Sequence, residues 1–167
     1  MWQVELPGLI TPAIDGSVQA TAINDLPARC KVAKWSSSSI GQEITVLCFD
    51  PTGSPYDTRF TLTYQYQRSL YGGFAPPPST NFSYLLGPGA NSLIPVATGL
   101  SVVVFPMQAK LPDDIQVTAS GWNSNFCALS PIWNHSGSDT VVKYVVCFNN
   151  SGALADTGYT ISDNTLA

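Results

Sequence analysis

Residues 60–66 read Phe60-Thr61-Leu62-Thr63-Tyr64-Gln65-Tyr66, a regular alternation of apolar and polar side chains. Successive side chains of a β-strand point to opposite faces, so this alternation predicts a strand with one buried face. The 13 glycines and 13 prolines of the chain are misfits inside helices, and no long amphipathic helical pattern occurs. We therefore predict an all-β protein, with further strands at residues 4–6, 18–23, 30–35, 44–49, 100–105, 115–119, 127–133, 141–148 and 159–162.

Several short motifs occur twice in the same order. Val18-Gln19-Ala20-Thr21-Ala22 returns as Ile115-Gln116-Val117-Thr118-Ala119. A cysteine, a tryptophan and a Cys-Phe pair follow each copy: Cys30, Trp35 and Cys48-Phe49, then Cys127, Trp133 and Cys147-Phe148. The repetition predicts two tandem antiparallel β units, sandwich- or barrel-like, packed as one compact body. Residues 1–67 form the first copy, residues 68–98 a connector and residues 99–167 the second copy.

The connector is rich in large apolar side chains, which a flexible linker would leave in water. We expect it to be ordered and packed, with short extra strands at residues 82–86 and 93–96. Pro76-Pro77-Pro78 imposes an extended passage within it.

Four cysteines at matched places predict two disulfides. In each copy one cysteine begins an expected strand and the other ends the next, and an antiparallel pair brings these ends together. We predict the pairs Cys30–Cys48 and Cys127–Cys147. A zinc site is disfavoured, because no C-x-x-C spacing occurs and the chain has a single histidine. Structural disulfides are typical of exported proteins, so we expect a secreted protein.

The first copy resembles tandem repeats of secreted, actinobacterial-type bacterial proteins. The resemblance rests on Cys30-Lys31-Val32, Trp35, Gly41, Cys48-Phe49 and Asp57-Thr58-Arg59-Phe60-Thr61, together with Leu6-Pro7-Gly8-Leu9 and residues 18–22. The second copy departs from it with Ala128-Leu129-Ser130 in place of the basic stretch. It implies export and a modular architecture, and carries no assigned activity.

Charge excludes some partners. The chain has 11 acidic and 7 basic residues and a net charge of −4, and its only basic cluster is Arg29, Lys31 and Lys34. Nucleic-acid binding needs more clustered cations than this, so we expect no nucleic-acid partner. No apolar run approaches the roughly 20 residues of a membrane helix, so we expect no membrane insertion. The first residues lack a signal-peptide pattern, so export implies a removed signal or another route.

The sequence offers weak catalytic candidates. His135 lies in a Ser/Asn/Gly-rich segment and is expected to be an exposed turn residue. Asp57 and Asp156 are expected to cap turns, and Asp113-Asp114 to form a loop before a strand. We predict no enzyme, no cofactor and no metal. Two alternatives stay open: a hydrolase using His135 or an Asp pair, and a calcium site using Asp15, Asp113 or Asp114.

Aromatic residues are the better candidates for a binding site. Trp35 and Trp133 occur in both copies and are expected to be core anchors. Trp122 has no counterpart, and with Tyr71 and Phe74 it is the candidate contact surface, although packing against the connector explains Trp122 equally well. The sequence therefore predicts a secreted module that binds carbohydrate or protein, or that self-assembles. The alternative is an enzyme inhibitor presenting residues 36–39 or 76–78.

Overall fold

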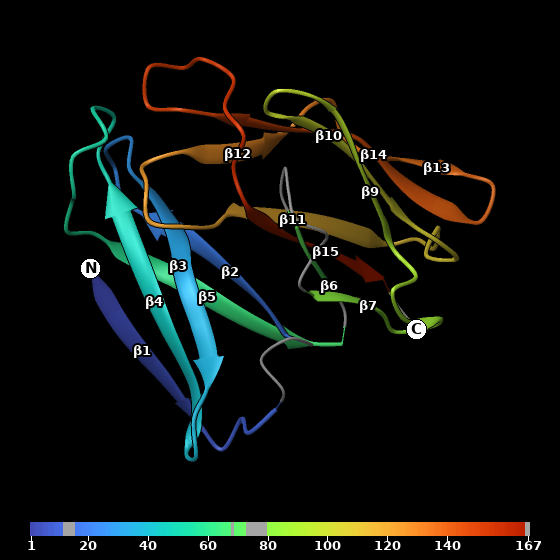
Figure 1. Cartoon of the computed structure of the whole chain (residues 1–167), viewed down its shortest axis with the longest axis horizontal. Coiled ribbons are helices and arrows are strands. Elements are labelled where there is room, and N and C mark those ends of the chain that lie inside the picture. The colour runs from blue at the N-terminus through green and yellow to red at the C-terminus, as the bar shows by residue number, and fades with distance from the viewer. Residues whose placement is uncertain (12–15, 68, 73–79, 166–167) are drawn as a thin grey trace.

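The structure, a computed structural model, describes residues 1–11, 16–67, 69–72 and 80–165; of residues 69–72 and 80 it describes the backbone. These residues form 15 strands and no helix, which confirms the all-β prediction (Figure 1). None of the described elements is a helix long and apolar enough to cross a membrane. The strands are β1 (Trp2–Pro7), β2 (Gly16–Ile23), β3 (Arg29–Ser37), β4 (Gly41–Phe49), β5 (Arg59–Tyr66), β6 (Ser69–Gly72), β7 (Thr80–Ser83), β8 (Gly87–Pro88), β9 (Ser92–Ala97), β10 (Leu100–Phe105), β11 (Asp113–Ala119), β12 (Phe126–Leu129), β13 (Asn134–Ser136), β14 (Asp139–Phe148) and β15 (Tyr159–Thr165).

The first half of the chain forms two sheets that enclose one core. One sheet has the order β1-β4-β3 and the other pairs β2 with β5. Both sheets contribute buried apolar side chains to a common cluster: Val18, Ala20, Val32, Ile44, Val46 and Cys48. The alternation of residues 60–66 places Phe60, Leu62 and Tyr64 of β5 against this cluster, as predicted.

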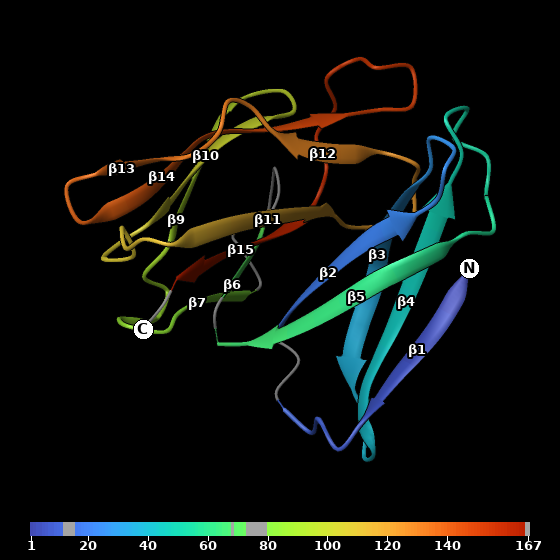
Figure 2. The same cartoon turned by 180° about the vertical axis from the view of Figure 1, so that it is seen from behind.

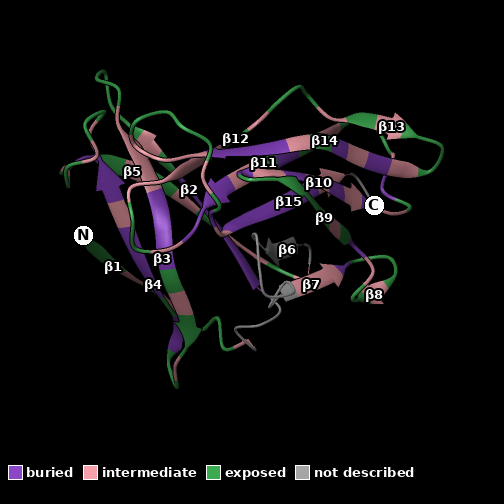
Figure 3. Cartoon of the chain, turned by 45° about the horizontal axis from the view of Figure 1, so that its top comes forward, coloured by how far each residue is buried: buried purple, intermediate pink, exposed green. Residues whose placement is uncertain are grey.

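The second half repeats this order of pairing. Strand β14 lies between β10 and β12, and β11 pairs with β15. A separate core lies between these sheets, and its buried residues follow β14 and β15 (Figure 3). The strands β6 and β9 of the connector extend the second half: β6 pairs with β15, and β9 pairs with β10. An internal duplication stays a prediction, and superposition of the two halves would test it.

Two predicted strands differ from the structure, and one proposed architecture is absent. The strand expected at residues 82–86 ends at Ser83 with β7, and residues 84–86 form a turn. Residues 127–129 belong to β12, residues 130–133 lie in no strand and the separate β13 begins at Asn134, because Pro131 has no N–H to donate and interrupts the pairing with β14. No sheet of the described residues closes into a barrel, so the open packing of sheets is the architecture observed. All the sheets pack into one compact body (Figure 1).

Both predicted disulfides are present. Cys30 lies opposite Cys48 in the β3–β4 ladder, and Cys127 lies opposite Cys147 in the β12–β14 ladder. The first disulfide links β3 to β4, and the second links β12 to β14. Trp35 and Trp133 pack partly buried against the two cores, as expected of core anchors.

The turns after the second cysteines have the same construction in both halves. Asp50 Oδ1 accepts hydrogen bonds from the N–H groups of Thr52 and Ser54, at 2.8 and 3.0 Å. Asn149 Oδ1 accepts the equivalent bonds from Ser151 and Ala153, at 2.9 and 3.1 Å. Gly53 and Gly152 close the turns with φ of 84° and 83°, a region that glycine adopts without strain.

We predict that removing either disulfide destabilises the protein strongly. The linked cysteines are 18 and 20 residues apart in sequence. Replacing Cys30 and Cys48, or Cys127 and Cys147, by Ala is expected to lower the free energy of unfolding by about 3 kcal/mol, measured by urea titration. Alkylation of the native protein is expected to add no label, and reduction to expose four reactive thiols. A labelled cysteine in the native protein would contradict the pairing.

Candidate functional site

The two halves meet along strand β2, which lies beside β11 and β15 (Figure 2). Its residues 16–20 are buried on both faces, because Val18 and Ala20 enter the first core while Ser17 and Gln19 face the second half. The contact is hydrogen-bonded: Thr160 Oγ1 donates to the carbonyl of Val18 at 2.7 Å. The N–H of Ala20 donates to Thr118 Oγ1 at 3.2 Å. The two units are therefore joined through a polar seam, separate from either apolar core.

A cavity of about 250 Å³ lies at one end of this seam. Strands β2 and β3 line it from the first half, and β11 and β12 line it from the second. The space exists because several lining side chains are small, namely Ala20, Ala22, Ala28 and Ala119. The larger polar and aromatic lining residues are Arg29, Lys31, Asn125 and Phe126. No Asp or Glu of the described chain lines this cavity.

Lys31 is a buried cation without a carboxylate partner among the described residues. Its side chain is 3% exposed, and its Nζ donates to Asn123 Oδ1 at 2.9 Å and to the carbonyl of Asn125 at 3.0 Å. Burial lowers the pKa of the Lys31 ammonium to about 8, and the neighbouring charge of Arg29 adds to the shift. An ammonium has three N–H donors, so one remains for a ligand.

Arg29 is the second cation of the cavity. Its guanidinium lies 4.6 Å from the ring centre of Phe126 and donates through Nε to the carbonyl of Ser124 at 3.3 Å. A further N–H of the guanidinium donates to the side chain of Asn150. Burial lowers the pKa of Arg29 and the charge of Asp50 opposes this, so the side chain stays protonated at neutral pH. Arg29 and Lys31 together give the cavity a positive lining.

Trp122 lies on the loop that borders the cavity. It is 60% exposed, which agrees with a contact surface and not with burial under the connector. The loop is held against β3 of the first half: Gly121 N–H donates to the carbonyl of Val32 at 3.0 Å, and Lys31 binds Asn123 and Asn125. Trp122 is therefore close in sequence to Asn125, which lines the cavity, and it lies on a loop that is hydrogen-bonded to β3 at both ends.

The other predicted contact residues, Tyr71 and Phe74, belong to a part of the chain whose side chains the structure does not describe. Tyr71 is in β6, where only the backbone is described, and Phe74 lies outside the described residues. The proposed inhibitory segment at residues 36–39 closes the β3–β4 hairpin, where Ser38 Oγ accepts the N–H groups of Ile40 and Gly41. Residues 76–78 also lie outside the described part of the chain.

The burial of Lys31 was missed by the sequence reasoning. Arg29, Lys31 and Lys34 form the basic cluster of the sequence, and of these three residues only Lys34 is exposed. The face of β3 that carries Lys31 is covered by a loop more than 90 residues further along the chain. Local pattern carries no signal for such a contact.

A second cluster of ionisable groups lies at the end of β11. Asp113 Oδ2 accepts hydrogen bonds from Trp133 Nε1 and pairs with His135 Nε2, both at 2.8 Å. The expectation that His135 is an exposed turn residue is wrong, because β13 pairs it with Thr140 and its side chain is 28% exposed. The expectation that Asp113-Asp114 forms a loop is also wrong, because both residues lie in β11.

Asp163 of β15 is the buried member of this second cluster. Burial raises the pKa of its carboxyl to about 6; the nearby Thr140 hydroxyl opposes the shift and the charge of Asp113 adds to it. Both carboxylate oxygens and Thr140 Oγ1 are buried, and the described residues offer neither side chain a partner in hydrogen-bond geometry.

The geometry bears on three roles that these acidic residues could have: metal ligands, parts of a hydrolase site and caps of backbone N–H groups. Within the described ranges no three His, Cys, Asp or Glu side chains are placed to hold a metal ion, and Asp15 lies outside them. A Ser-His hydrolase needs a hydroxyl on the histidine, and the partner of His135 in the described residues is the Asp113 carboxylate. Asp156 caps backbone as expected, accepting the N–H of Gly99 at 2.7 Å.

We predict that Asp163→Asn stabilises the protein more at pH 7 than at pH 4. The unfolded carboxyl has a pKa of 3.8, so between about pH 4 and 6 the folded protein binds more protons than the unfolded chain. The contribution of Asp163 to stability is thus present below pH 4 and lost as the pH rises through 6. The neighbouring His135 side chain is 28% exposed, so solvent screens the cluster and we expect a difference of about 1 kcal/mol between the two pH values.

Urea titration of both proteins at the two pH values measures this difference. Both proteins keep Asp113 and His135, so the comparison isolates Asp163. Asp114→Asn, on an exposed residue of the same sheet, is the matched control and is expected to change less. Equal effects of Asp163→Asn at both pH values would contradict the raised pKa.

Comparison with known proteins supplies no relative from which to transfer a function. No family model, no curated protein and no solved structure matches this chain. The resemblance of its Cys30 and Cys48 motifs to repeats of secreted bacterial proteins therefore stays a prediction. Its function has to be argued from the cavity, the Trp122 loop and the chemistry that they offer.

Proposed function

We propose that the protein is a secreted, non-catalytic module that binds an acidic carbohydrate, a sugar chain bearing carboxylate groups. The observation that carries the proposal is the cavity between the two halves, which holds Arg29 and Lys31 and no carboxylate. The ligand supplies the missing negative charge. Secretion is supported by the two disulfides, which are compatible with an extracellular protein.

The anionic character of the ligand follows from the cost of the buried lysine. A buried ammonium is destabilising unless its charge is balanced, and a carboxylate in the cavity balances it. Arg29 adds a planar donor suited to two carboxylate oxygens. The whole chain carries −4, so a polyanion is not drawn to it by long-range attraction and binding depends on this local pair.

The carbohydrate character follows from the shape and surroundings of the cavity. About 250 Å³ is small for a binding pocket and suits a single sugar ring, not a folded partner. Asn125 lines the cavity, and its side-chain amide, which gives one N–H to Thr157, keeps its oxygen and a second N–H for hydroxyls. Trp122 exposes a large aromatic face on the adjoining loop, on which the apolar side of a further ring packs. A glycosidase needs two carboxylates at the bond that it cleaves, and the described lining has none.

We predict that the protein binds uronic acid polymers such as polygalacturonate and does not bind their carboxyl-reduced forms. Lys31→Met is expected to weaken binding by about tenfold or more, because it removes a charge-assisted contact. Trp122→Ala is expected to weaken it about tenfold through loss of ring packing, at little cost in stability since the side chain is exposed. Isothermal titration calorimetry measures both effects, with urea titration as the check on folding.

Lys34→Met is the matched control for this experiment. Lys34 lies on the same strand as Lys31 and is exposed, so its loss is expected to change affinity by less than about twofold. Equal binding of acidic and reduced polymers, or equal losses in Lys34→Met and Lys31→Met, would overturn the proposal. Binding to a protein partner alone would overturn the ligand class, and hydrolysis abolished by His135→Ala would overturn the non-catalytic reading.

We also predict that binding weakens as the pH rises above 8. The ligand favours the charged form of Lys31, whose pKa in the free protein is about 8. Affinity is therefore highest below that pH and falls as the free protein loses the proton, and complex formation near pH 8.5 takes up protons. Calorimetry in buffers of different ionisation enthalpy measures the uptake. Lys31→Met is expected to show neither effect, and pH-independent binding from pH 7 to 9 in the wild type would contradict the role of Lys31.

A further inference from the structure

The two halves differ in how their sheets end. In the second half, β9 pairs with the outer edge of β10 and β6 pairs with the outer edge of β15. In the first half, β1 and β5 hold the equivalent places in the order of pairing, and no strand of the described chain pairs with their outer edges. The connector thus extends both sheets of one half and neither sheet of the other (Figure 1).

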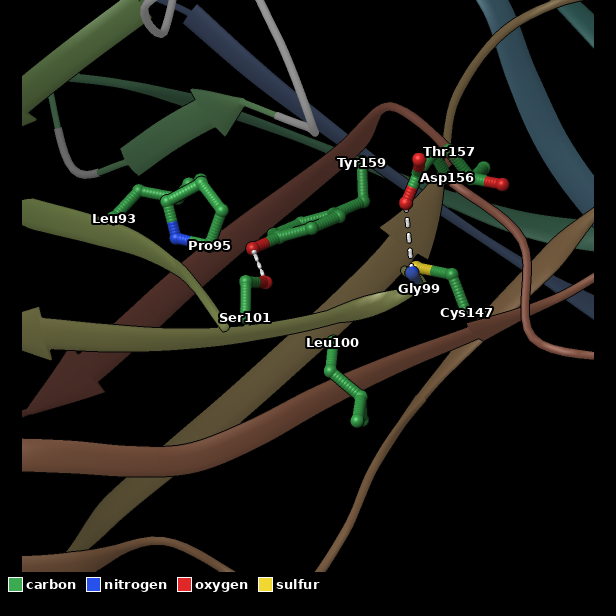
Figure 4. Close-up of a pocket in the computed structure, with 9 residues that line it drawn as sticks. All are labelled: Leu93, Pro95, Gly99, Leu100, Ser101, Cys147, Asp156, Thr157 and Tyr159. Carbon is green, nitrogen blue, oxygen red and sulfur yellow. Dashed lines mark hydrogen bonds between the residues drawn. The ribbon is translucent and has the colours of Figure 1, made fainter. Parts of the chain in front are cut away.

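Strand β9 covers an aromatic side chain in the second half. Leu93 and Pro95 of β9 lie beside Tyr159, whose hydroxyl is hydrogen-bonded to Ser101 Oγ (Figure 4). Leu93 also packs against the second core. Under this cover Tyr159 is only 2% exposed.

The equivalent place in the first half is uncovered. Phe60 lies opposite Ala22, and in the second half Tyr159 lies opposite Ala119. Trp2 lies opposite Val46, two residues before Cys48. Ser101 in the same way lies opposite Val145, two residues before Cys147. The ring centres of Trp2 and Phe60 are 6.1 Å apart, and Trp2 is 42% exposed. The first half therefore presents an aromatic pair at a place that a strand covers in the second half.

The edge of β1 is able to pair with an added strand. Gly8 N–H donates to the carbonyl of Ile40 at 2.8 Å, which fixes the alternation of the antiparallel ladder. Even-numbered residues of β1 consequently direct their backbone groups at β4. Gln3 and Glu5 direct theirs outward, where they are free to accept and donate to another strand.

We propose that β1 accepts an antiparallel strand from a partner chain, of the type of β9: extended, uncharged and apolar. Its recognition is main-chain pairing with Gln3 and Glu5, and its specificity is an apolar side chain that takes the role of Leu93 and covers Trp2 and Phe60. In β9 the register places Leu93 opposite Val103 and Ile94 opposite Val102. Val4 holds the place of Val103, so the incoming leucine lies opposite Val4 and the isoleucine opposite Gln3.

The probe is a synthetic peptide with the sequence of residues 91–98, Asn-Ser-Leu-Ile-Pro-Val-Ala-Thr, added to the full-length protein. Binding is measured by calorimetry, and its site by amide hydrogen exchange. We expect exchange at Gln3 and Glu5 to slow by about tenfold or more at saturation, because these N–H groups become paired.

Matched variants of protein and peptide test the pairing. Glu5→Pro removes an outward N–H and leaves the bonds to β4 in place, and it is expected to weaken peptide binding by about tenfold or more. Glu5→Ala keeps the N–H and is expected to bind within about twofold of the wild type. In the peptide, N-methylation of the isoleucine blocks a bond to β1, whereas N-methylation of the leucine points to solvent and is expected to be harmless.

The peptide pair keeps the test decisive if Glu5→Pro does not fold. No binding to the folded wild type, equal binding of the two N-methylated peptides, or protection at β5 or β10 in place of β1 would each overturn the proposal. Pairing of β1 with β1 of a second copy, seen as a dimer that Glu5→Pro dissolves and the peptide does not, would overturn the proposed occupant.

Discussion

The burial of β2 on both faces is the constraint on which the arrangement of the molecule depends. One face of this strand completes an apolar core, and the other is hydrogen-bonded to the second half through Gln19 and the hydroxyls of Thr118 and Thr160. Each such hydrogen bond contributes only about 1 kcal/mol net, but a buried polar group left unpaired costs more. The seam therefore selects one relative position of the halves. The position of the cavity, at the end of this seam, follows from that selection.

Local chemistry predicted much of the fold. The alternation of residues 60–66, the paired Gly and Asx turns and the strand-end cysteines each act between near neighbours in the ladder, and each gave the correct element. The break at Pro131 is signalled by a residue without an N–H, whereas the apolar character of residues 127–133 predicts one continuous strand. The pairing of His135 with Asp113 and the covering of Lys31 join strands that are distant in sequence, and no periodicity encodes them.

Buried charge is concentrated in two places in a chain with few charges. Arg29 and Lys31 lie at the seam, and Asp113, His135 and Asp163 lie at the end of β11. In the second place His135 and Asp113 are hydrogen-bonded to each other, so this pair is satisfied within the protein. In the first place burial lowers the pKa of Lys31, and the like charge of Arg29 adds to the shift. This difference is why the seam, and not the acidic cluster, is the better candidate for a ligand.

Arg29 and Phe126 occupy the same ladder position in the two halves, each directly before a disulfide cysteine and opposite a phenylalanine. In the folded protein the Arg29 guanidinium lies 4.6 Å from the ring centre of Phe126, and both residues line the cavity. One half supplies the cation and the other supplies the aromatic ring, so neither half alone makes this contact. Each half therefore depends on the other for the partner of its residue at this position. A substitution at one position therefore changes which residues are acceptable at its counterpart in the other half.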